Sequence, residues 1–157
     1  MKTTSVNSQN LVGEMYVSYK LKSNVKLSEL PTIKTSNDTY EYLKSVWNLD
    51  TINYSEDMMM LLLSRSLKVL GWVRISSGGF DGTMCDPKVV FSIALTGKAS
   101  SIILAHNHPS GNLQPSQADI NIMKKIAECG RLLDIKLLDH IIITSEGYLS
   151  FADDGLM

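Results

Sequence analysis

The chain has 157 residues, of which 44% are hydrophobic and 20% are charged, so its length suits one globular domain with a short extension. Fifteen basic and sixteen acidic side chains leave a formal net charge of -1, which does not favour binding to a nucleic acid backbone. The longest apolar run, Met58 to Leu63, has six residues, too few for a membrane-spanning helix or a signal peptide. We therefore expect a cytoplasmic protein without a membrane partner.

Residues 1–35 are rich in serine, threonine, asparagine and lysine. We expect an N-terminal extension there, with one strand where apolar residues alternate from Met15 to Leu21. The predicted domain covers residues 36–157. Its first helix is expected over about 38–48, because Ser36 to Asp38 offer N-cap residues and apolar side chains follow at helical spacing.

Apolar segments at Met58–Leu63 and Val69–Ile75 predict a hairpin whose first strand is buried on both faces, followed by a loop over 76–82. Asp86 and Pro87 then begin a helix that Gly97 ends. The remaining elements expected are a strand at Ser101–Ala105, a helix that begins at Ser116 and that Gly130 ends, and strands at about 136–138, 140–144 and 148–151. This order predicts an α/β fold with a mixed β-sheet.

The densest chemical signal lies in residues 105–119, which contain two of the three histidines of the chain. His106 and His108 stand two residues apart at the end of a predicted strand, so their imidazoles point to the same face. Asp119 lies one turn into the next helix and is able to fold back toward them. Two imidazoles and one carboxylate suit a zinc ion (Zn2+) with one open position for water. Alternatively, the histidines are polar residues on a loop edge.

Ser116 and Asp119 also have the spacing of a capping box, in which the serine side chain caps the helix and the acid at the third helical position accepts a hydrogen bond from the backbone N–H of the serine. This structural role is compatible with metal binding, because a capped helix start holds the carboxylate in a fixed direction.

The pattern His106-x-His108, seven residues, Ser116-x-x-Asp119 resembles the metal-binding motif of the JAMM (MPN-type) metallopeptidases. The segments 106–111 and 138–142 are similar to the RadC branch of that superfamily, over a match from about residue 36 to the C-terminus. The resemblance implies a JAMM/MPN-like, cytidine deaminase-like fold in which helices sandwich the sheet. It implies that the two histidines and Asp119 bind zinc, and that Ser116 supports the oxyanion or positions the water.

The same resemblance calls for an upstream glutamate, and Glu56 stands where RadC-like sequences carry theirs, with Asp57 as the close rival. Zinc with one carboxylate ligand keeps a positive charge, which lowers the pKa of bound water toward about 7. A carboxylate beside that water accepts its proton and returns it to the leaving amine. The structural alternative for Glu56 is an exposed acid at the start of a strand.

Three further residues are candidates for supporting roles. His140 matches the RadC pattern, and we expect it either to support a metal ligand, to face the substrate, or to be a hydrogen-bonded strand residue. Asn107 and Ser110 are expected to hold the metal loop together through hydrogen bonds to the backbone.

The leading functional hypothesis is a zinc-dependent hydrolase that cleaves an amide or isopeptide bond in a peptide or protein substrate. The alternatives are a DNA-associated accessory module and a metal-dependent nuclease. Residues 1–35 show no glycine-centred helical hairpin of the kind that RadC proteins commonly carry for DNA, and the charge gives nucleic acid no support as a partner. The sequence names neither the substrate nor the oligomeric state.

Overall fold

A computed structural model describes residues 25–78 and 85–157. Its five strands form one sheet in the order β2-β1-β3-β4-β5. Strands β3 and β4 are parallel and the other neighbours are antiparallel, so the predicted mixed sheet is confirmed. The strands are β1 (Asp57–Leu63), β2 (Val69–Ser77), β3 (Ser101–Asn107), β4 (Lys136–Ile143) and β5 (Tyr148–Ser150).

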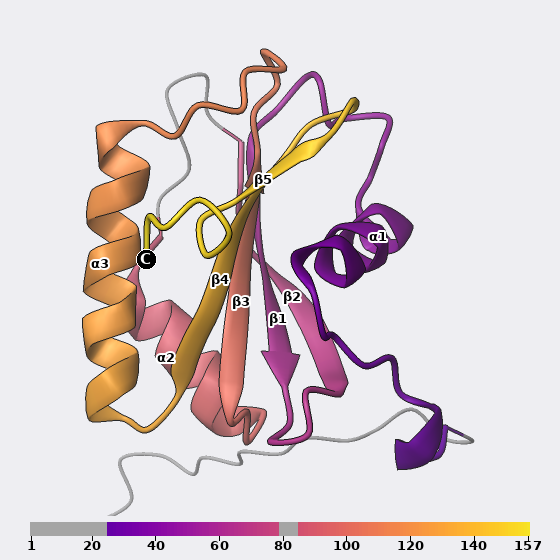
Figure 1. The fold of residues 1–157 in the computed structure, drawn as a ribbon, viewed down its shortest axis with the longest axis vertical. Coiled ribbons are helices and arrows are strands. Elements are labelled where there is room, and N and C mark those ends of the chain that lie inside the picture. The colour runs from indigo at the N-terminus through magenta and orange to yellow at the C-terminus, as the bar shows by residue number, and fades with distance from the viewer. Residues whose placement is uncertain (1–24, 79–84) are drawn as a thin grey trace, which may run out of the picture.

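Helices cover both faces of the sheet (Figure 1). Helix α1 (Ser36–Val46) packs on one face, whereas α2 (Pro87–Thr96) and α3 (Gln117–Leu132) pack on the other, and a 3-10 turn, η2, covers Leu27–Glu29. Each face carries its own cluster of buried apolar side chains, and β1 and β3 are buried along their whole length. In the part of the chain that the structure describes, no helix is long and apolar enough to span a membrane.

Local hydrogen bonds determine where the helices begin. Helix α1 starts at Ser36, earlier than expected, because Thr35 and Asp38 form a capping box. The Thr35 hydroxyl accepts from the N–H of Asp38, and the Asp38 carboxylate accepts from the N–H of Thr35. It ends at Val46, where the backbone turns extended and buries the side chain of Trp47. Helix α2 begins as predicted, with Asp86 accepting a hydrogen bond from the backbone of the second helical residue.

Gly130 does not end α3, which continues to Leu132, so this prediction is wrong. A Cβ atom at Gly130 would lie 2.3 Å from the carbonyl oxygen of Ile135 and 3.4 Å from the ring of Phe91. Gly130 is therefore required because α3 packs closely against Ile135 and Phe91 at this point. Its position near the end of the helix had suggested that it ends the helix.

The strands predicted at 136–138 and 140–144 are one strand, β4. A register shift opposite Ile102 and Ile103 leaves Leu138 unpaired, which is the local irregularity of a β-bulge and not a break in the strand. Ser76 and Ser77, expected in a loop, belong to β2 because their backbone pairs with the start of β1. Positions 79–82 of that loop and the strand predicted at 15–21 lie outside the described residues.

Candidate metal centre

The end of β3 brings two histidines onto one face of the sheet. His106 is the last residue but one of β3, is fully buried, and pairs with Met58 of β1. His108 follows the strand directly. Their Nε2 atoms lie 2.9 Å apart, as the two-residue period of a strand predicts.

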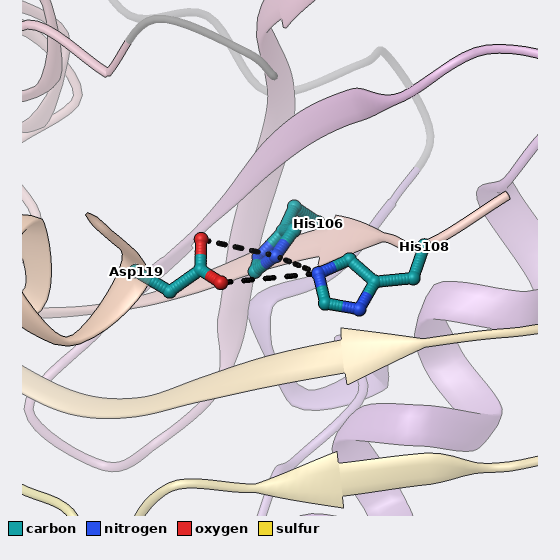
Figure 2. A group of neighbouring side chains, drawn as sticks. All are labelled: His106, His108 and Asp119. Atoms are coloured by element: carbon teal, nitrogen blue, oxygen red, sulfur yellow. Dashed lines mark hydrogen bonds and ion pairs between the residues drawn. The ribbon is translucent and has the colours of Figure 1, made fainter. Parts of the chain in front are cut away.

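Asp119 reaches the same point from the first turn of α3, and Figure 2 shows its carboxylate facing both rings. Its Oδ1 lies 3.4 Å from His106 Nε2 and its Oδ2 lies 3.9 Å from His108 Nε2. The predicted capping box is present: Oδ2 accepts hydrogen bonds from the backbone N–H and the hydroxyl of Ser116, both at 2.7 Å. The helix start therefore holds the carboxylate in place and leaves Oδ1 turned toward His106.

The three side chains form a group that could hold a metal ion, because one ligand atom from each lies within 4.8 Å of the others. Burial lowers the pKa of His106 to about 4, with the charge of Asp119 acting in the opposite direction and His108 adding to the decrease. His106 is therefore a neutral imidazole at pH 7. Neutral imidazoles and a carboxylate are the donor set that zinc takes in catalytic sites, so the residues present fit such an ion.

Glu56 lies beside this group. It precedes β1 directly, and because Met58 pairs with His106, the start of β1 lies next to the end of β3. A cavity of about 470 Å3 is lined by Glu56 together with His108, Ser110 and Ser116. The structure thus places four of the predicted site residues around one cavity.

Asp57, the rival of Glu56, does not line this cavity. Its side chain is 3% exposed, and its Oδ2 lies 3.7 Å from a guanidinium nitrogen of Arg74. The carboxylate of Asp57 is therefore buried away from the cavity that Glu56 lines.

Asn107 holds a different segment from the one expected. Its side-chain amide donates to the carbonyl oxygens of Ile52 and Ser55, at 2.6 and 2.8 Å, and its Oδ1 accepts from the N–H of Asp57 at 2.7 Å. These bonds fasten the backbone on both sides of Glu56 to the strand that carries His106. The prediction that Asn107 holds the metal loop is corrected accordingly, because the alternation along β3 turns its side chain to the other face.

Ser110 does contact the loop, where its hydroxyl accepts a hydrogen bond from the N–H of Asn112. The carbonyl oxygen of Asn112 lies 2.5 Å from His108 Nδ1 and orients that ring. Sequence reasoning missed this contact, because any residue type offers a backbone carbonyl. Tyr54 and Gln114 also line the cavity without having been predicted.

His140 lies in β4 beside His106 and is completely buried, so it offers no surface to a substrate. Burial lowers its pKa well below the ordinary value, with the neighbouring histidines adding to the decrease. The backbone at this point is held by Asp139, whose carboxylate accepts from the N–H of His140 and from the hydroxyl of Ser150. Burial raises the pKa of Asp139.

A family model described as a RadC-like JAB domain matches residues 33–156, which is most of the chain. The chain belongs to the RadC-like JAB domain family. A UPF0758 protein of Flavobacterium johnsoniae is 48% identical over 101 residues, covering 64% of this chain and 44% of that relative. A UPF0758 protein of Porphyromonas gingivalis is 35% identical over 139 residues, covering 88% of this chain and 61% of the relative.

A further UPF0758 protein, of Clostridium perfringens, is 33% identical over 138 residues, covering 88% of this chain and 60% of the relative. This RadC-like chain thus spans about half the length of the curated relatives it matches, from 44% to 61%. Membership of the family confirms the predicted resemblance and agrees with the mixed α/β architecture.

Proposed function

We propose that this RadC-like domain is a zinc-dependent hydrolase that cleaves an amide or isopeptide bond in a peptide or protein. The observation that carries the proposal is the position of Glu56 and Ser116 around one cavity with His108, next to the three-residue donor group. His106, His108 and Asp119 would hold the ion. A zinc ion held there would supply Lewis-acid chemistry and make water a nucleophile near neutral pH.

Glu56 is the proposed general base. Its carboxylate accepts a proton from the attacking water and returns it to the leaving amine. The hydrogen bonds of Asn107 hold the backbone before and after Glu56, which limits how far this carboxylate moves from the histidines.

Ser116 is the proposed donor to the oxyanion. Its hydroxyl donates to Asp119 Oδ2 in this structure, so in the proposed mechanism it turns toward the substrate oxygen as negative charge develops there. Its backbone N–H continues to hold Asp119.

The test begins with the zinc content of the full chain purified without added metal. Wild type, His106→Ala, Glu56→Gln and the exposed control Glu128→Gln are compared by elemental analysis and by cleavage of peptides, including peptides with an isopeptide bond at a lysine side chain. We expect His106→Ala to lose zinc and activity, Glu56→Gln to keep zinc and lose activity, and the control to keep both. Stoichiometric zinc in His106→Ala would refute the assignment of the metal ligands. Full activity in Glu56→Gln would refute the assignment of Glu56 as the general base.

Two further assays address the alternatives that involve DNA. Cleavage of plasmid or oligonucleotides in the presence of zinc, lost in Glu56→Gln, would replace the peptidase proposal with a nuclease. Salt-sensitive DNA binding that persists in His106→Ala, without hydrolysis of any substrate, would favour an accessory module.

A further inference from the structure

A third imidazole lies directly behind the candidate metal ligands. His140 comes from β4, the parallel neighbour of β3, and its Nε2 lies 2.5 Å from His106 Nδ1. His106 thus contacts His108 through one ring nitrogen and His140 through the other. The chain contains three histidines, and all three lie in this row.

The contacts of His108 determine which of its nitrogens carries the proton. A carbonyl oxygen only accepts hydrogen bonds, so the contact with Asn112 places the proton of the neutral ring on Nδ1. The Nε2 of His108 then keeps the lone pair that faces His106 and Asp119. His108 is therefore in the tautomer that binds a metal ion.

The pair of His106 and His140 has two arrangements with the same number of protons. In the first, His106 Nδ1–H donates to His140 Nε2, which leaves a lone pair on His106 Nε2 and the proton of His140 on its Nδ1. In the second, His140 Nε2–H donates to His106 Nδ1, and His106 Nε2–H donates to His108 Nε2, 2.9 Å away. Only the first arrangement allows His106 to bind a metal ion, because a protonated ring nitrogen has no lone pair.

We propose that His140 is a positioning residue that gives His106 its metal-binding tautomer by accepting the Nδ1 proton, and that both rings exchange tautomers when a metal ion binds. The proposal rests on the metal site of the proposed function. On binding, the proton of each ring moves from Nε2 to Nδ1, so the pair neither gains nor loses a proton.

Two features of the surroundings support this exchange. Within the described parts of the chain, His140 Nδ1 is buried and has no hydrogen-bond partner, so no neighbour there holds the ring in one tautomer. The ring itself is held in place, because Phe151 packs against it at 4.8 Å between centroids and donates its N–H to the carbonyl oxygen of His140.

The direct test is nitrogen NMR of the imidazole rings in the 15N-labelled full chain, with and without zinc. With three histidines the spectrum is small enough to assign. We expect the protons of His106 and His140 on Nε2 without zinc and on Nδ1 with zinc. A zinc-loaded spectrum with the His140 proton on Nε2 overturns the positioning role, and a zinc-free spectrum that already shows the first arrangement overturns the exchange.

Variants measure the effect on metal affinity by competition with a chromophoric zinc chelator. His140→Leu removes the acceptor, and the dissociation constant for zinc should rise about 10- to 100-fold. His140→Gln offers an amide oxygen in place of Nε2 and should restore most of the affinity. The control Thr144→Val removes the hydroxyl of another buried residue next to β4, which donates to the carbonyl of Gly147 and accepts from the N–H groups of Glu146 and Gly147, and it should leave zinc affinity unchanged.

The outcomes separate the two proposals. Wild type that binds no zinc at any concentration tested refutes the metal site and the proposed function with it. Wild type that binds zinc, together with a folded His140→Leu variant of equal affinity, overturns the role of His140 alone. If His140→Leu does not fold, the NMR spectra of wild type decide.

Discussion

Replacing Asn107 by alanine tests whether one buried amide positions the general base. The substitution removes three hydrogen bonds, to Ile52, Ser55 and Asp57, all between 2.6 and 2.8 Å. At about 1 kcal/mol for each bond, the free energy of unfolding should fall by about 3 kcal/mol. For a chain of this size, that corresponds to a decrease in Tm of roughly 6 to 12 °C.

The effect on function should differ from the effect on the metal. Asn107 contacts the backbone around Glu56 and makes none of the contacts that hold Asp119, so Asn107→Ala should keep stoichiometric zinc while peptidase activity falls about 100-fold or more. Asn107→Asp has the same shape but no amide donor, and should be at least as destabilised. The matched control is Asn121→Ala, on the exposed side of α3, which should change stability by less than about 0.5 kcal/mol.

Urea unfolding followed by circular dichroism, zinc analysis and peptide cleavage measure these three properties on the same preparations. Asn107→Ala with the stability and activity of wild type would refute the positioning role. Loss of zinc together with normal cleavage after zinc is restored in excess would instead place Asn107 in support of the metal loop.

Three further predictions follow from packing, capping and burial. Gly130→Ala should lower the free energy of unfolding by about 1 to 3 kcal/mol, because its Cβ would lie 2.3 Å from the carbonyl of Ile135, whereas Gly147→Ala, with open space around it, should have little effect in the same urea titration. Ser116→Ala should lower the free energy of unfolding by about 1 kcal/mol, because it removes the cap of α3. It should also weaken zinc binding, measured by chelator competition, because it removes a hydrogen bond to the carboxylate of Asp119. Unchanged zinc affinity would contradict this second effect. The zinc-free protein should lose stability in acid, because the unfolded chain protonates His106 near pH 6.5 and the folded site only near 4. The contribution of His106 to stability is fully present above pH 6.5 and falls toward pH 4, by about 2 kcal/mol between pH 7 and pH 5. Urea titrations at both pH values should show that His106→Gln reduces the slope by this amount, and a slope should remain because burial also lowers the pKa of His140.

The sequence by itself was sufficient for features that depend on neighbouring residues. The contact between His106 and His108 follows from the period of a strand, and the position of Asp119 follows from a capping box that closes within four residues. The sandwich of helices and a mixed sheet followed from the order of apolar segments and from the resemblance to the RadC family. The error at Gly130 arose because a helix-ending glycine and a close-packed glycine look alike in sequence.

The tertiary structure alone decided how distant parts of the chain support the site. His140 contacts His106 across 34 positions of the sequence, because the register of β4 places it opposite Leu104, two residues from His106. Asn107 contacts Asp57 across 50 positions, because the register that pairs Met58 with His106 brings the start of β1 to the end of β3. Strand register depends on which faces become buried when all the elements pack together. Neither contact leaves a local pattern in the sequence, since the hydrogen bonds that define it form only after those strands have paired.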